Sequence, residues 1–306
     1  MTDLTGNKGK QLLGSIILTF VSIIWGTGFV FQRVGMDSIE PITFTASRMT
    51  ISAVAVGIVA PFMKDAGASG GKGRLKDTVT GGICCGCFLV TATIFQQAGL
   101  VYTTAGKAGF ITALYMLFVP VISFLIFRKR YSWLVWTAVF IGIAGMYLLC
   151  MTEGFSFAKG DDLELICAVL YSCHILCCGH FVTKGNPVRI SAIQFVAASV
   201  ISWILAFITE TPSMDKIVSA LIPIMYCGFV SGGIGYTLQI VAQKFTDPTV
   251  ASLLMSLESV FAVLAGVLIL HERMSTREAI GCLVMFTAII IVQIPTSRKG
   301  IKPSGK

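Results

Sequence analysis

The stretch SLLMSLESVFAVLAGVLIL, residues 252–270, is long and apolar enough to cross a lipid bilayer as a helix. It nevertheless contains a carboxylate, Glu258, deep inside the apolar run. A charge at the centre of a bilayer costs roughly 2.5–3.5 kcal/mol on insertion scales, so residues of this kind are usually functional. The stretch therefore predicts a membrane protein and provides a first candidate site residue.

The composition of the whole chain supports a membrane protein. Of its 306 residues, 55% are hydrophobic and only 12% are charged, whereas soluble domains carry about 25% charged residues. The net charge of +8 does not indicate a nucleic-acid partner, because the basic residues form short clusters between apolar runs. Anionic lipid headgroups explain such clusters. The ten cysteines lie in or at the ends of apolar runs, and we expect them to pack as small buried side chains.

Apolar runs of spanning length recur along the chain and are joined by short connections. We predict ten transmembrane helices over residues 12–34, 41–63, 78–101, 104–127, 132–151, 162–182, 190–209, 217–241, 248–270 and 276–295.

Lysine and arginine residues indicate the orientation of these helices. Most of those outside the spans lie in 1–11, 64–77, 128–131, 183–189, 242–247 and 296–306. These segments share one side of the membrane, and the positive-inside rule assigns that side to the cytoplasm. We therefore expect a multi-pass plasma-membrane protein with both termini cytoplasmic.

The two halves of the chain match weakly when one is shifted by 143 residues. FRKRYS (127–132) then lies over LHERMS (270–275), and Tyr115 lies over Glu258. With a slightly larger shift, Trp25 faces Tyr171. Five spans per half is an odd number, so the second copy enters the membrane inverted. The predicted fold is an all-α membrane protein with two inverted five-helix repeats, 12–151 and 162–295.

Four stretches have a recognisable family pattern: WGTGFVFQRVGM (25–36), ITFTASRMTISA (42–53), GLVYTTAGKAGFITALYMLFVPVISFLIFRKRYS (99–132) and SLLMSLESVFAVLAGVLILHERMS (252–275). They resemble the first, second, third-to-fifth and ninth-to-tenth span signatures of EamA-type carriers in the drug/metabolite transporter superfamily. The sixth span departs from the pattern, because YSCHILCCGHF (171–181) is rich in cysteine and histidine.

The resemblance implies a secondary transporter, not an enzyme, that moves small metabolites such as amino acids by alternating access. It implies export, a cavity between spans 1–4 and 6–9, and spans 5 and 10 at the periphery. We expect no cofactor, a small-molecule substrate with protons as a further candidate, and a monomer or homodimer in the bilayer.

Polar and aromatic residues inside the spans are the candidate substrate contacts, since a carrier replaces water around its substrate with sparse polar groups and aromatic walls. Those without a formal charge are Trp25, Thr27, Gln96, Tyr171, His174 and Gln239. His174 could relay protons or be a hydrogen-bonded packing residue. Its spacing from Cys178 could also suit zinc, but no other helix completes a ligand set, so we expect no metal.

Charged residues give three further candidates. Glu258 could bind a substrate ammonium, cycle a proton, or join helices through Ser256 and Ser259. Arg48 could hold a substrate carboxylate or pair with Glu40. Lys107, at the start of the fourth span, could capture an anion or extend to the headgroups.

Two other classes of protein are alternatives to a carrier. A membrane-embedded enzyme would need a nucleophile–base pair or a metal dyad at one depth. The sequence contains no HExxH and no paired intramembrane aspartates. A channel or receptor is the third class, and a receptor would be expected to have larger loops or tails.

Overall fold

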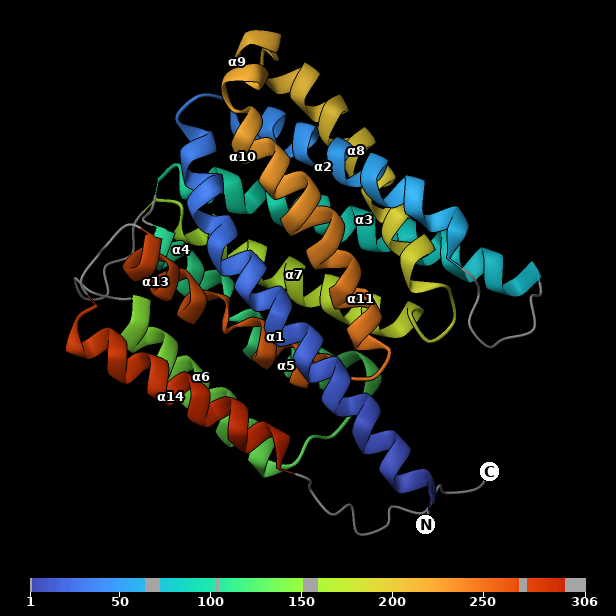
Figure 1. The fold of residues 1–306 in the computed structure, drawn as a ribbon, viewed down its shortest axis with the longest axis vertical. Helices are drawn as coiled ribbons and strands as arrows, with labels where there is room; N and C mark the ends of the chain where they lie inside the picture. Colours follow the sequence, from blue (N-terminus) through green and yellow to red (C-terminus); the bar gives the residue numbers. More distant parts are fainter. Residues whose placement is uncertain (1, 64–71, 103–104, 151–158, 270–273, 295–306) are drawn as a thin grey trace.

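The computed structural model describes residues 2–63, 72–102, 105–150, 159–269 and 274–294, and within them the chain is helical without strands (Figure 1). The predicted all-α class is therefore confirmed. In the first half the elements are α1 (Thr2–Met36), α2 (Pro41–Val59), the 3-10 turn η1 (Ala60–Phe62), α3 (Lys72–Leu100), α4 (Ala105–Thr112), α5 (Tyr115–Phe127) and α6 (Trp133–Cys150).

The second half contains more, shorter elements. They are α7 (Asp161–Phe181), α8 (Pro187–Thr209), α9 (Met214–Ser219), α10 (Leu221–Met225), the π-helix η2 (Tyr226–Tyr236), α11 (Thr237–Gln243), α12 (Pro248–Met255), α13 (Glu258–Ile269) and α14 (Thr276–Gln293).

Nine helical stretches in the described residues are long and apolar enough to cross a membrane, and they correspond to nine of the ten predicted spans. The predicted ninth span, 248–270, corresponds to α12 and α13, which together run from Pro248 to Ile269 with a break between them. Many large apolar side chains on the outer helix faces are exposed, including Leu12, Ile16 and Phe20 on α1. Such faces suit contact with lipid tails.

The fourth and ninth spans are not regular helices throughout. Each contains a break: α4 ends at Thr112 and α5 begins at Tyr115, while α12 ends at Met255 and α13 begins at Glu258. At both breaks the backbone tightens, so that amide groups bond to the carbonyl three residues back, as in Leu114 N to Ile111 O at 3.1 Å and Leu257 N to Leu254 O at 3.2 Å. Such turns inside a span often mark a functional hinge.

The helices are arranged around a centre formed by these broken spans (Figure 1). α1 packs against α13 and η2, α2 against α8, and α3 against both α7 and α8. α6 packs along α14 at one edge of the bundle. The fifth and tenth spans thus lie together at the periphery, away from α2 and α8 at the opposite edge.

The α6–α14 contact depends on glycine. A Cβ atom at Gly281 would lie 2.8 Å from the backbone nitrogen of Leu149, and one at Gly145 would lie 2.8 Å from that of Met285. Backbone atoms cannot turn away as a side chain can, so an added methyl would push the helices apart. Small residues at such crossings let helix backbones approach closely in a membrane.

We therefore expect Gly281→Ala to lower the stability of the protein by about 1–3 kcal/mol, the usual cost of overpacking. The measurement is the midpoint of thermal unfolding in detergent. Gly57→Ala on α2 is the matched control, because a Cβ there would meet nothing within 4 Å. Both changes raise helix propensity equally, so equal midpoints for the two variants would contradict the close contact.

Candidate functional site

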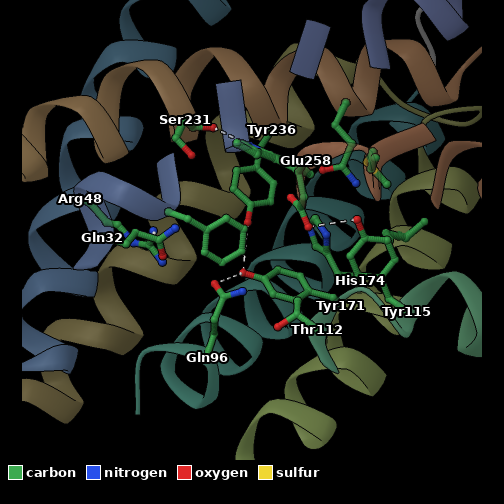
Figure 2. Close-up of a pocket in the computed structure, with 15 residues that line it drawn as sticks. Gln32, Arg48, Gln96, Thr112, Tyr115, Tyr171, His174, Ser231, Tyr236 and Glu258 are labelled. Atoms are coloured by element: carbon green, nitrogen blue, oxygen red, sulfur yellow. Dashed lines mark hydrogen bonds between the residues drawn. The ribbon is translucent and has the colours of Figure 1, made fainter. Parts of the chain in front are cut away.

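A cavity of about 40 Å³ lies at the centre of the bundle (Figure 2). Its walls come from spans 1–4, 6, 8 and 9, and the seventh span contributes no lining residue. The lining residues are Trp25, Phe29, Gln32, Arg48, Gln96, Thr112, Tyr115, Tyr171, His174, Ile175, Ser231, Tyr236, Gln239, Met255 and Glu258. Seven of the nine residues proposed from the sequence are among them.

An aromatic wall joins α1 to η2. The Trp25 indole Nε1 donates to the carbonyl oxygen of Ser231 at 3.2 Å, and the Trp25 and Tyr236 ring centroids are 4.7 Å apart. Gly235 makes room for the indole, since a Cβ there would lie 2.7 Å from Nε1. On the other side of α1, a Cβ at Gly26 would lie 2.5 Å from the Glu258 carbonyl oxygen. The first span is thereby held tightly between η2 and α13.

The π-helix η2 runs over YCGFVSGGIGY, which includes four glycines. Its wider turns leave backbone groups available to neighbouring helices: the Ser52 hydroxyl donates to the Gly228 carbonyl oxygen at 2.6 Å. Short π-helical stretches are rare and occur frequently at functional sites. The glycines in this span therefore combine close packing with an irregular backbone beside the cavity.

Tyr171 links several polar groups at the floor of the cavity. Its hydroxyl lies 3.3 Å from Gln96 Oε1 and 3.3 Å from the Thr93 hydroxyl, and it accepts from the Tyr236 hydroxyl at 3.2 Å. The third, sixth and eighth spans are joined by this network. Tyr171, which the repeat indicated as a candidate substrate contact, lies at the centre of this hydrogen-bond network (Figure 2).

Arg48 lies on one side of the cavity and is only 6% exposed. Its Nη1 donates to Gln32 Oε1 at 3.2 Å, its guanidinium lies 5.6 Å from the Phe44 ring centroid, and its Nε has no hydrogen-bond partner. The suggested pairing with Glu40 is not observed, since Glu40 binds Lys216. Within the described part of the chain no carboxylate lies within 4 Å of the guanidinium.

Glu258 lies on the other side of the Tyr236 ring (Figure 2) and is 5% exposed. As the first residue of α13 it sits at a helix N-terminus, where negative charge is favoured. Its Oε1 accepts from the Tyr115 hydroxyl at 3.3 Å, so the two residues aligned by the sequence repeat are in contact. The suggested serine partners are not used, because Ser256 donates to the Leu253 carbonyl oxygen and Ser259 Oγ has no partner.

Two neutral lining residues also carry unpartnered polar atoms. His174 is fully buried, with Nε2 3.1 Å from Gln194 Oε1 and 3.4 Å from Cys178 Sγ, while its Nδ1 has no partner. Gln239 Oε1 has none either. Buried polar atoms are usually satisfied, so those on a cavity wall are candidates for ligand contacts. No group of His, Cys, Asp or Glu in the described residues is arranged to hold a metal.

Two proposed residues lie away from the cavity lining. Thr27 bonds to the Ile24 carbonyl oxygen at 3.0 Å and to the Tyr226 hydroxyl. Lys107 forms an ion pair with Asp161 at 2.5 Å.

The list of site residues drawn from the sequence did not include the cavity residues Gln32 and Ser231. Gln32 follows Trp25 by seven residues, two helical turns, so helical spacing could have indicated it; Ser231 lines the cavity from an irregular helix that no local pattern predicts.

Ion pairs join the two halves of the chain at the ends of the helices. Glu40 pairs with Lys216, and Lys129 pairs with Asp247, which also caps α12 through Thr249 N at 2.9 Å. The Lys216 hydrogen bond holds the pKa of Glu40 below its usual value. Burial alone would lower the pKa of Lys129, but the Asp247 carboxylate outweighs it and the pKa is raised. Together with Lys107–Asp161, these pairs link residues of the two halves of the chain.

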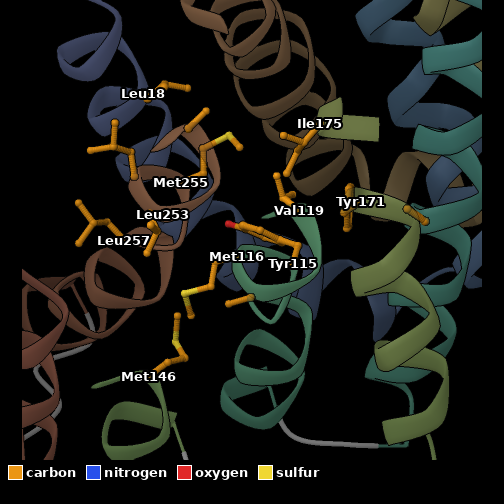
Figure 3. Close-up of a cluster of buried hydrophobic side chains, with 14 of the residues drawn as sticks. Leu18, Tyr115, Met116, Val119, Met146, Tyr171, Ile175, Leu253, Met255 and Leu257 are labelled. Carbon is orange, nitrogen blue, oxygen red and sulfur yellow. The ribbon is translucent and has the colours of Figure 1, made fainter. Parts of the chain in front are cut away.

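The cavity lies inside the main hydrophobic core rather than at its edge. Tyr115, Tyr171, Ile175 and Met255 belong both to the core and to the cavity lining. Figure 3 shows Tyr115 between the α12 side chains and those of α7. Several of the side chains that form the core therefore also form the cavity wall.

A polytopic helical membrane protein with a polar cavity buried at its centre has the architecture of a transporter. The EamA-like transporter family model matches residues 12–151 and 159–294, and the chain belongs to that family. It is 29% identical over 285 residues, 93% of this chain and 87% of the relative, to an uncharacterised transporter of Archaeoglobus fulgidus. It is 21% identical over 236 residues, 75% of each chain, to a probable terminal-alkyne amino-acid exporter of Streptantibioticus cattleyicolor.

A solved structure titled "Crystal structure of protein" has the same fold. The TM-score is 0.74 at 20% sequence identity, and the match covers 91% of this chain and 97% of that one.

The Lys129–Asp247 pair gives a test of how the halves are joined. Lys129→Glu places a second negative charge beside Asp247, and we expect a loss of about 1 kcal/mol, the upper range for partly exposed pairs. Thermal unfolding in detergent measures it. Lys129→Arg should keep the wild-type midpoint, and Arg130→Glu, an exposed neighbour, is the matched control for charge. Equal midpoints for Lys129→Glu and Arg130→Glu would show that the pair contributes nothing.

Proposed function

We propose that this protein is a secondary transporter of small zwitterions of the amino-acid class. One observation carries the proposal: the same cavity is lined by the buried guanidinium of Arg48 and the buried carboxyl group of Glu258, and in the described residues neither has an oppositely charged side chain within 4 Å. Burying an unpaired charge is costly. A ligand carrying a carboxylate and an ammonium group would neutralise both at once.

Arg48 and Glu258 have hydrogen-bonding atoms that suit the carboxylate and the ammonium group of such a ligand. Nη1 of Arg48 is bonded to Gln32, while Nε has no partner. Nε and the adjacent Nη2 form a fork that can bind a carboxylate through two hydrogen bonds. Glu258 has one hydrogen-bond donor in Tyr115 and can accept from an ammonium. Trp25, Phe29 and Tyr236 give apolar faces for a side chain.

Transport requires the cavity to enlarge. A volume of about 40 Å³ holds only about three water molecules, because one water needs about 10–15 Å³ of such space. The breaks in the fourth and ninth spans and the π-helix η2 are places where the backbone can change without loss of a regular helix. We propose that the repeats 12–151 and 162–295 are inverted and rock about these breaks to alternate access.

The direction and orientation are also proposals. Clustered basic residues between alternate spans support cytoplasmic termini in the plasma membrane. The similarity to a probable terminal-alkyne amino-acid exporter supports export of an amino-acid-like compound, and the presence of both charges in the cavity agrees with that class of substrate.

Counterflow in proteoliposomes tests the substrate class. Vesicles loaded with an unlabelled amino acid should accumulate the same labelled compound from outside, across a panel of neutral amino acids. Amines and carboxylic acids of the same side chain should compete poorly, since each leaves one buried charge unpaired. Equal competition by either single-charge analogue would contradict recognition of a zwitterion.

Substitution of each charged residue tests its assignment. We expect Arg48→Gln and Glu258→Gln to weaken competition by the substrate about 10- to 100-fold, because a hydrogen bond to a charged group contributes about 1.5–3 kcal/mol. Arg33→Gln and Glu278→Gln are the matched controls: Arg33 is exposed, Glu278 is half-buried and does not line the cavity, and glutamine is compatible with the capping box of α14. Wild-type affinity for the substrate in both Arg48→Gln and Glu258→Gln would show that neither residue contributes to binding.

A further inference from the structure

A second intramembrane carboxylate, Glu164 on α7, lies outside the cavity lining. It is fully buried, at 0% exposure. Its Oε2 accepts from the Thr112 hydroxyl at 2.8 Å, while its Oε1 has no hydrogen-bond partner. No cation of the described residues lies within 4 Å of it. Substrate recognition as proposed above gives this side chain no role.

The groups around Glu164 leave the carboxyl free to change its protonation. α3 approaches with Gly99, where a Cβ would lie 2.6 Å from Oε1. α4 carries Lys107, which is engaged with Asp161 one turn before Glu164 on α7. The absence of a side chain at Gly99 lets the unpartnered oxygen pack closely against α3.

The remaining titratable neighbours do not bind the carboxyl. Cys167 follows on the same helix and is buried. α5 brings Tyr115, whose hydroxyl is directed to Glu258 instead. Tyr102 at the end of α3 has Lys159 over its ring at 4.6 Å. α11 and α12, which also pack against α7, carry no titratable side chain.

Thr112 connects Glu164 to the central cavity. The threonine lines the cavity beside Tyr171 and Gln96 (Figure 2), and its hydroxyl donates to the carboxylate. A hydroxyl both donates and accepts, so it can pass a proton between a carboxyl on one side and water or ligand on the other. On the other side of Glu164 lie Asp161 and Lys107, near the ends of α7 and α4.

A purely structural carboxylate in a membrane would have both oxygens satisfied, because a half-satisfied buried group is expensive. Glu164 has one oxygen satisfied and one directed at a glycine. Uptake of a proton removes the charge, and its release restores it, with no other reactant. Ionisable residues placed in this way inside membrane spans form the proton paths of transporters.

We propose that Glu164 is a proton-binding site that couples proton movement to transport, exchanging its proton with the cavity through the Thr112 hydroxyl. Glu258 then binds substrate, and Glu164 carries the coupled proton. The proposal rests on the transport function proposed above.

The test compares two fluxes in the same proteoliposomes. Counterflow of a labelled neutral amino acid measures exchange, which needs no net proton movement. A pH-sensitive dye trapped inside measures proton flux when substrate is added. We expect Glu164→Gln to retain counterflow and to lose substrate-dependent proton flux to the level of protein-free vesicles. Thr112→Val should lower the ratio of proton flux to counterflow, and Thr112→Ser should restore it; Glu278→Gln is the control for the loss of a carboxyl.

The outcomes separate the two proposals. Counterflow in the wild type with an unchanged flux ratio in Glu164→Gln and Thr112→Val would overturn the role of Glu164 and leave the transport function standing. Counterflow without any proton flux in the wild type would do the same. Absence of counterflow with every amino acid would overturn both proposals. If Glu164→Gln does not fold, the ratio in Thr112→Val against Thr112→Ser decides.

Discussion

The structure depends on the constraint that a bilayer provides no water to satisfy backbone groups, so irregular backbone is tolerated only where protein surrounds it. In this protein the irregular segments meet at the centre. The breaks before Tyr115 and Glu258 face one another across a hydrogen bond between residues 143 positions apart, and η2 lies beside them. The regular helices α6 and α14 lie at the edge. The cavity is located where the chain departs from the regular helix.

The charged side chains inside the bundle lie in or next to the same central cavity. Arg48 and Glu258 lie on opposite sides of an aromatic wall in one cavity, while Glu164 lies behind Thr112. Each is separated from a counter-ion within the described residues, whereas Glu40, Lys129 and Lys107 at the helix ends are paired. The ion pairs thus lie at the helix ends, whereas the side chains without a counter-ion lie at the centre, where we propose that a ligand and a proton bind.

Much of this arrangement was predictable from the sequence. Apolar run lengths indicated the helices, and the shift between halves aligned Tyr115 with Glu258, which are in contact. Polarity inside spans identified Arg48, Gln96, Tyr171, His174 and Gln239 as cavity residues. The break at residues 256–257 was not predictable, because SLLMSLESV contains neither proline nor glycine and the tightening of the backbone follows from tertiary packing. The partners of Arg48 and Lys107 were also missed, since contacts between distant helices leave no local pattern.

Glu164 shows a further limit of prediction from the sequence. It stands at the start of the sixth span in DDLELICAV, where acidic residues at a helix N-terminus are ordinary, and the sequence alone does not separate it from Asp161 and Asp162. Only the packing of α3 and α4 over α7 buries it and directs one oxygen at Gly99.

A structure of the protein bound to a transported amino acid tests the central claim most directly. The account predicts the ligand carboxylate at Arg48, its ammonium at Glu258 and its side chain against the rings of Trp25 and Tyr236. A ligand bound in the cavity with neither charged group at these residues, or bound elsewhere in the bundle, would contradict it.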